Sequence, residues 1–179
     1  MTVQKMEARA KFPDIDVPRL GGGTLNLGQP EGGHDWRLVV VYRGKHCPIC
    51  TSYLKTLNTL LPDFQALGVD VVAVSGDPET KAADQMTEVA PHYPVGYGLT
   101  EAQMHTLGLY VSAPRSAQET DRNFAEPGLF VINHEGKVQI TDISNAPFAR
   151  PDLKVLLGGL RFVRNPDNNY PIRGTVNHP

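Results

Sequence analysis

The amino-acid sequence predicts an α/β protein with a mixed central β-sheet that is flanked by helices on both faces. Two short apolar runs rich in β-branched residues, 37–42 and 69–75, have the pattern of buried strands, and a segment with helical signals follows each. Two more short runs, 129–133 and 137–141, are separated by a tight turn and predict a hairpin. Because strands that alternate with helices are joined by right-handed crossovers, the first strands should be parallel, and the hairpin should add antiparallel strands.

The first helix follows the strand at 37–42. Residues 1–36 precede that strand as a mostly irregular entry, with a short strand or hairpin around 21–27. A 3–4–3 spacing of apolar residues predicts the buried face of the helix: Leu54, Leu57, Leu61 and Phe64. Pro62 should kink or restart the helix, and Gly68 should end it.

The second strand and two further helices come next. After the strand at 69–75, Asp77 is a candidate cap and Pro78 a candidate first-turn residue for a helix that runs to about Val89. Residues 100–107 begin with a capping-box pattern and predict a short helix.

The last third of the chain closes the predicted sheet. Residues 112–126 have the composition of a polar surface loop, and the hairpin turn lies at 134–136. Pro151 should open a final helix with four inward leucines: Leu153, Leu156, Leu157 and Leu160. The order of strand, helix, strand, helix, helix, hairpin and helix is the thioredoxin-like arrangement.

Length and composition indicate one soluble globular domain. The chain has 179 residues, and we divide it into an N-terminal extension (1–10), a domain (11–164) and a polar C-terminal tail or arm (165–179). A net charge of −2 and a pI near 6.3 do not indicate a nucleic-acid-binding surface. No apolar stretch approaches the ~20 residues that span a bilayer, and the N-terminus lacks the apolar core of a signal peptide, so we expect no membrane partner and a cytoplasmic location.

Chemistry is predicted at the two cysteines of the chain, Cys47 and Cys50, which form a C-x-x-C pair after the first strand. In a reducing compartment such a pair is redox-active or binds metal more often than it forms a permanent disulfide. A helix that starts at Cys47 has Pro48 at its first position, where the missing N–H costs nothing. Its free N–H groups and its dipole then favour the Cys47 thiolate.

Basic residues upstream should act in the same direction. Arg43, Lys45 and His46 precede the pair, so the pKa of Cys47 should lie below the ~8.5 of a free cysteine. For His46 we favour a solvated residue whose charge tunes the site over a specific acid–base role. Cys50 shares the inward face of the helix with the leucines, so we assign Cys47 as the exposed nucleophile and Cys50 as the buried resolving cysteine.

A structural zinc site is the alternative use of these residues. His46 or His34 could join the two thiolates, but such a site takes four ligands, and the sequence has no second C-x-x-C or H-x-x-x-H. We therefore expect no metal and no other cofactor.

The residues around the pair resemble the alkyl hydroperoxide reductase/thiol-specific antioxidant branch of the thioredoxin superfamily, the peroxiredoxin-like proteins. The resemblance covers roughly residues 10–160, and four segments carry it: 12–15, 42–50, 71–77 and 128–137. It implies a thioredoxin-like fold and thiol-dependent redox activity.

Two positions depart from the family pattern. The P-x-x-x-T/S-x-x-C motif has Val40 and Gly44 at its proline and threonine positions, and the position of the usual peroxide-orienting arginine holds Pro127. Three other arginines are candidates to replace that arginine: Arg43, Arg115 and Arg122.

Pro127 fits the family position of the thioredoxin cis-proline, which faces the C-x-x-C; a trans proline at the start of an edge strand is the alternative. These departures place dithiol–disulfide exchange first and an atypical two-cysteine peroxidase second, with a non-catalytic thioredoxin-fold binding module third. The expected partners are a disulfide or peroxide substrate and a thioredoxin- or glutathione-type reductant, and a homodimer is one assembly that we consider.

Overall fold

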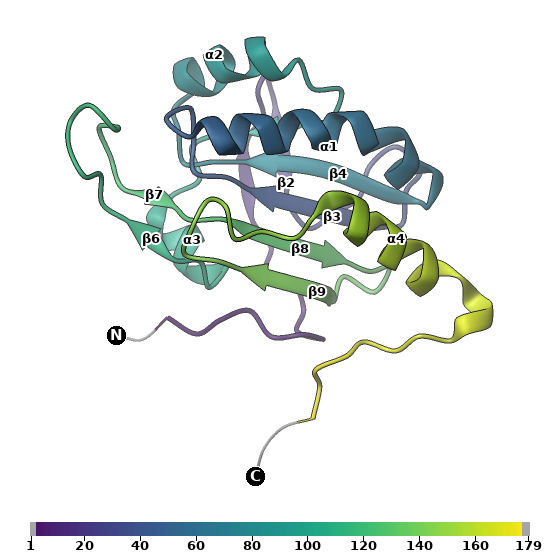
Figure 1. The fold of residues 1–179 in the computed structure, drawn as a ribbon. Coiled ribbons are helices and arrows are strands. Elements are labelled where there is room, and N and C mark those ends of the chain that lie inside the picture. The colour runs from purple at the N-terminus through teal and green to yellow at the C-terminus, as the bar shows by residue number, and fades with distance from the viewer. Residues whose placement is uncertain (1–2, 177–179) are drawn as a thin grey trace.

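A five-stranded mixed sheet with the strand order β5-β4-β3-β8-β9 forms the centre of the molecule (Figure 1). The computed structural model describes residues 3–176. The strands of this sheet are β3 (Trp36–Val41), β4 (Val69–Val74), β5 (Val95–Gly96), β8 (Gly128–Ile132) and β9 (Val138–Ile143). The helices are α1 (Pro48–Ala66), α2 (Glu79–Val89), α3 (Glu101–Thr106) and α4 (Leu153–Arg164). Two small antiparallel pairs complete the fold, β1 (Asp16–Pro18) with β2 (Thr24–Asn26) and β6 (Val111–Ser112) with β7 (Phe124–Ala125).

The strand directions follow from the connections. β3 pairs with β4 in parallel, and β4 with β5, because helical crossovers join them. β8 is antiparallel to both β3 and β9, and a tight turn joins β8 to β9. Every residue of β3, β4 and β8 is buried, which explains why these strands are mostly apolar rather than alternating. The charged exceptions are Arg37 and Asp70.

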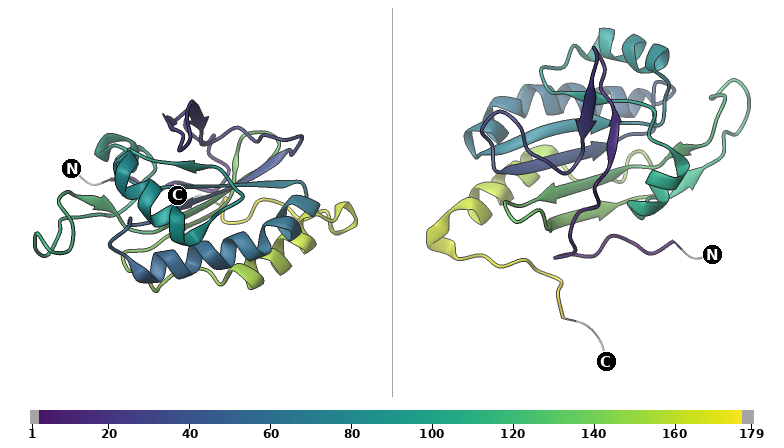
Figure 2. Two further views of the ribbon diagram at one scale, coloured as in Figure 1. Left: turned by 90° about the horizontal axis from the view of Figure 1, so that it is seen from above. Right: turned by 180° about the vertical axis from the view of Figure 1, so that it is seen from behind.

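Helices cover both faces of the sheet, as the sequence predicts. One core cluster joins the sheet to α1, α2 and α4, and its buried side chains include Leu54, Met86 and Leu157. The other cluster lies beneath α3 and the β1–β2 hairpin, where Leu25 and Met104 are buried. Figure 2 shows α1 and α4 on one side of the sheet and the hairpin on the other. The predicted thioredoxin-like α/β fold is confirmed.

Three helix details differ from the sequence prediction. α1 continues through Pro62 as one helix, and the buried Leu61 and Phe64 on either side of Pro62 hold it against the sheet. The cap of α2 is Pro78, since the Asp77 side chain makes no capping bond. The N-cap of α4 is Asp152, whose carboxylate accepts two backbone N–H bonds of the first turn, so the helix begins after Pro151 rather than at it.

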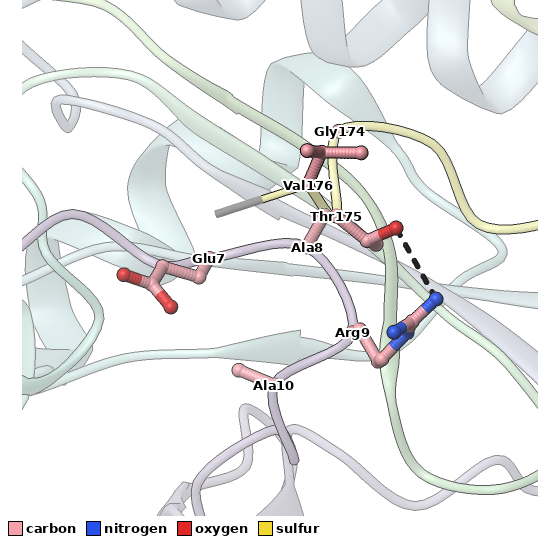
Figure 3. Close-up of a pocket in the computed structure, with 7 residues that line it drawn as sticks. All are labelled: Glu7, Ala8, Arg9, Ala10, Gly174, Thr175 and Val176. Atoms are coloured by element: carbon pink, nitrogen blue, oxygen red, sulfur yellow. Dashed lines mark hydrogen bonds between the residues drawn. The ribbon is translucent and has the colours of Figure 1, made fainter. Parts of the chain in front are cut away.

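The two ends of the described chain lie beside one another. The backbone N–H of Arg9 donates to the carbonyl of Val138 at 2.8 Å, which places the N-terminal segment along β9. Arg9 Nη2 also donates to Thr175 Oγ1 at 3.2 Å, and Figure 3 shows the shallow pocket that the two segments form. After a short 3-10 helix (Pro166–Asn168), the Tyr170 ring packs edge-on against Phe162.

The predicted division at residues 10 and 164 stays a prediction. Residues 1–2 of the extension and 177–179 of the tail lie outside the described part of the chain. Over residues 3–176, no helix combines the length and the apolar character that crossing a bilayer requires.

Candidate active site

Cys47 is the N-cap of α1, at the end of the loop that leaves β3. Its backbone is extended, and its sulfur accepts the backbone N–H of Cys50 at 3.2 Å. Pro48 is the first helical residue, as predicted, where the helix needs no N–H. The local sequence thus places a sulfur where a Ser or Asp oxygen commonly caps a helix, in the field of the helix dipole.

The pKa values of the two thiols are shifted in opposite directions. The pKa of Cys47 is lowered to about 6, first because the Cys50 thiol donates a hydrogen bond to it. The Cys50 backbone N–H and Arg43 lower this pKa further, and burial opposes them. The pKa of Cys50 is raised well above its ordinary range, because its proton is held by Cys47 and because it is buried. At neutral pH the pair is therefore one thiolate and one thiol.

Both sulfurs belong to buried residues, which corrects the prediction of an exposed Cys47. Cys47 exposes 2% of its surface and Cys50 0%. The reason is the cap itself, because a sulfur that accepts the Cys50 N–H folds back over the first helical turn and joins the core cluster. Between the two cysteines, Ile49 remains 47% exposed.

Arg43 and His46 precede Cys47 and pack against the segment 119–126, which contains β7. Arg43 Nε lies 3.1 Å from a Glu126 carboxylate oxygen, and Arg43 Nη2 lies 3.7 Å from Glu119. The guanidinium stacks over the Phe124 ring at 4.8 Å, and the His46 ring lies 4.4 Å from that ring. Burial and Arg43 lower the pKa of His46, so this ring is a packing group and not the solvated cation that we predicted.

A tight backbone approach explains the glycine at the family's threonine position. Gly44 has φ +136°, and a Cβ there would lie 2.7 Å from the Asp77 Oδ2. That carboxylate accepts the backbone N–H of Lys45 at 2.7 Å, while Gln85 Nε2 donates to the Gly44 carbonyl at 3.1 Å. The Lys45 side chain turns away from the cysteines and pairs with Asp84.

Arg150 is the site residue that the sequence reasoning missed. Its Nη1 donates to the Cys50 sulfur at 3.7 Å, and its guanidinium stacks over the Tyr53 ring at 4.2 Å. It comes from the segment between β9 and α4, 100 residues from Cys50. The only signal in the sequence is a basic residue next to Pro151, at the predicted start of a helix.

The other two candidate arginines lie elsewhere. The Arg115 side chain is 87% exposed and pairs with Glu119, whereas Arg122 pairs with Asp121. Pro127 is buried directly before β8, and no peptide bond over residues 3–176 is cis, so its bond is trans. Its carbonyl accepts the Ser144 N–H at 3.1 Å. Arg43 is therefore the candidate that reaches Cys47.

Metal ligands are not gathered here. Among residues 3–176, no three His, Cys, Asp or Glu side chains are grouped so that they could hold a metal ion.

Comparisons with known proteins bear on both the sequence and the fold of the chain. Residues 8–141 match the model of the AhpC/TSA family. The chain belongs to this family. Membership confirms the resemblance found in the sequence, and it makes the chain a thiol-dependent enzyme of the peroxidase and redoxin type. No curated protein matches the chain in sequence.

Solved peroxiredoxin structures resemble this AhpC/TSA chain in fold. A cysteine-to-serine mutant of the peroxiredoxin 6 of Arenicola marina has a TM-score of 0.74 at 19% identity, over 90% of this chain and 75% of that one. Peroxidoxin BcpB from Mycobacterium tuberculosis has a TM-score of 0.71 at 19% identity, over 87% and 97%. Mycobacterium tuberculosis AhpC has a TM-score of 0.73 at 13% identity, over 92% and 96%. Similarity at this level of identity supports the thioredoxin-like fold.

The lowered pKa of Cys47 has a measurable consequence. We expect the ultraviolet absorbance of a thiolate to rise with pH and to reach its half-point near pH 6, because Cys47 loses its proton there. Cys47→Ser should remove this transition, and Cys50→Ala should move it to higher pH, because alanine has no side-chain proton to donate to Cys47. A half-point at ~8.5, the value of an unperturbed cysteine, would contradict the site geometry.

Proposed function

We propose that this AhpC/TSA chain is a two-cysteine oxidoreductase in which Cys47 attacks the oxidised substrate and Cys50 resolves the product. The observation that carries the proposal is the cap of α1, where the Cys47 sulfur accepts the backbone N–H of Cys50 at 3.2 Å and the pKa of Cys47 is lowered. A thiolate is the nucleophilic form of cysteine, and this arrangement stabilises it only at Cys47. Cys50 keeps its proton until the second step.

A hydroperoxide substrate is reduced in two steps, one at each cysteine. The Cys47 thiolate attacks the terminal peroxide oxygen, the O–O bond breaks, and the leaving alkoxide or hydroxide takes up a proton. Cys47 is then a sulfenic acid. The Cys50 sulfur attacks the Cys47 sulfur, loses its proton, and displaces hydroxide, so that a disulfide and water form. A thioredoxin- or glutathione-type thiol then returns two electrons and regenerates the dithiol. Such thiols are present in a reducing compartment such as the cytoplasm.

Burial of the nucleophile supports a small hydroperoxide as the preferred substrate. A disulfide in a folded protein must bring its own chain within bonding distance of a sulfur, and Cys47 is only 2% exposed. Pro127 in the trans form also does not match the cis-proline on which disulfide exchange was favoured from the sequence. We therefore place peroxide reduction first and disulfide exchange second, the reverse of the order expected from the sequence. Disulfide exchange remains the second candidate, because the exposed Ile49 between the cysteines offers an apolar contact to a partner.

Single-turnover kinetics separate these functions. We expect the reduced protein to react with hydrogen peroxide much faster than free cysteine thiolate at the same pH, and to react slowly with oxidised glutathione. Mass spectrometry should then find wild-type protein with two hydrogens fewer, because the disulfide has formed. Cys50→Ser should instead gain one oxygen that a sulfenic-acid reagent traps.

Two outcomes would count against the proposal. A peroxide rate no faster than that of free cysteine thiolate would leave disulfide exchange as the function. A pair that cannot be cycled between dithiol and disulfide in glutathione buffers would leave a non-catalytic binding module.

A further inference from the structure

In the described structure, the side chains that form a hydrogen bond with the Cys50 sulfur are those of Cys47 and Arg150. Arg150 Nη1 lies 3.7 Å from the Cys50 sulfur. Stacking over Tyr53 holds the plane of the guanidinium, and the Tyr53 hydroxyl donates to the carbonyl of Pro151 at 2.7 Å. The residue after Arg150 is thus tied to α1 one turn beyond Cys50, so the guanidinium is held in place from two directions.

Arg150 has no ion-pair partner among the described residues, and Asp142 and Asp152 act at longer range on the neighbouring Tyr53. Over residues 3–176, no carboxylate lies within salt-bridge distance of Arg150, whereas Arg43 is flanked by Glu119 and Glu126. Nε and Nη2 of Arg150 are buried and have no hydrogen-bond partner. A partly buried cation with unpaired N–H groups favours an anion beside it, and the Cys50 sulfur is the atom to which an Arg150 N–H donates.

The resolving step needs such an anion. Cys50 must give up its proton to attack the Cys47 sulfenic acid, but it is fully buried, which disfavours a thiolate. Once Cys47 is oxidised, it no longer carries the negative charge that holds the Cys50 proton. The other groups that act on Cys50 are the Arg43 backbone N–H and the buried Tyr42 phenol, and neither brings a charged side chain to this sulfur.

We propose that Arg150 is a catalytic residue of the resolving step, in which its Nη1–H donates to the Cys50 sulfur and stabilises the thiolate that attacks Cys47. The inference rests on the proposed function, because it assigns a role within the Cys47–Cys50 cycle. The same contact serves the return reaction. When an external thiol attacks Cys47 of the disulfide, Cys50 leaves as a thiolate beside Arg150. Arg43 then stabilises the thiolate of Cys47, and Arg150 stabilises the thiolate of Cys50.

Arg150→Met tests this role because it keeps the stem over Tyr53 and removes the charge. In single-turnover reactions with hydrogen peroxide, the formation of sulfenic acid should keep its wild-type rate. Disulfide formation should slow by about ten- to a hundredfold, the range for loss of one hydrogen bond to a charged group. Sulfenic acid should accumulate, and excess peroxide should drive it on to sulfinic acid. The pH at which the second step reaches half its maximal rate should rise, which a purely structural role would not cause.

Arg150→Lys and Arg161→Met are the matched variants. Lysine keeps the charge and should restore part of the second step, while Arg161, with a 56% exposed side chain on α4, should leave both steps unchanged. If Arg150→Met does not fold, Arg150→Gln should resolve more slowly than Arg150→Lys. Wild-type rates and pH profile for the second step in the charge-removing variant would overturn the inference and leave the proposed function intact. Absence of any peroxide reaction in the wild type would instead refute the proposed function.

Discussion

Cys47→Ser is expected to abolish turnover of hydroperoxide. Removing the attacking atom of a covalent reaction commonly costs on the order of 10³-fold or more in kcat. The cysteine that remains, Cys50, is fully buried, and burial raises the pKa of its thiol. The measurement is the rate of peroxide consumption with a dithiol reductant, compared between wild type and variant. The loss should be chemical rather than structural, because serine is itself a favoured N-cap and its hydroxyl can accept the Cys50 N–H.

Cys50→Ser is the matched control for this change. It should keep the first reaction with peroxide, lose the internal disulfide, and form a mixed disulfide on Cys47 when a thiol is added. Thermal unfolding of both variants should stay near that of the wild type if α1 is intact. The opposite pattern, in which Cys47→Ser still reacts and Cys50→Ser does not, would exchange the two roles.

The parts of the fold that the sequence predicted are those with local patterns. Buried parallel strands must be apolar on both faces, so the runs at 37–42 and 69–75 are visible in one sequence, and the structure places strands there. The capping box at Thr100 likewise satisfies its own helix end, with both bonds present. The two-residue strands β5, β6 and β7 were not predicted, because two residues are too few to show a period.

The sequence predicted only those features of the site that depend on the first turn of α1. The lowered pKa of Cys47 was predicted from its position at the start of the helix, and the structure gives the same direction. The exposure of Cys47 was wrong, because the direction of its sulfur depends on which N–H it accepts. Arg150 was missed because its distance from Cys50 is set by how α4 returns across the sheet, which no local pattern encodes.

Arg37 illustrates the same limit in the core. A basic residue at the start of an apolar run resembles the exposed flank of a strand, yet Arg37 is 0% exposed. It lies directly opposite Asp70 in the parallel register of β3 and β4, and its Nε donates to Asp70 Oδ2 at 3.2 Å. The same oxygen accepts the backbone N–H of Glu31 at 2.8 Å, so the pair also ties the entry segment to the sheet. Pairing register is a long-range property, which one sequence does not reveal.

Asp70→Ala should therefore lower the free energy of unfolding by ~3–5 kcal/mol, because it leaves the buried guanidinium of Arg37 without its counter-charge. Urea denaturation followed by circular dichroism measures the change. The double variant Arg37→Met, Asp70→Leu should recover most of the loss, since an apolar pair removes the uncompensated charge together with the ion pair. A single variant within about 1 kcal/mol of the wild type would place the pair among the weak ones that are typical of protein surfaces. A double variant no more stable than Asp70→Ala would mean that the bond to Glu31, rather than the ion pair, holds this side of the sheet.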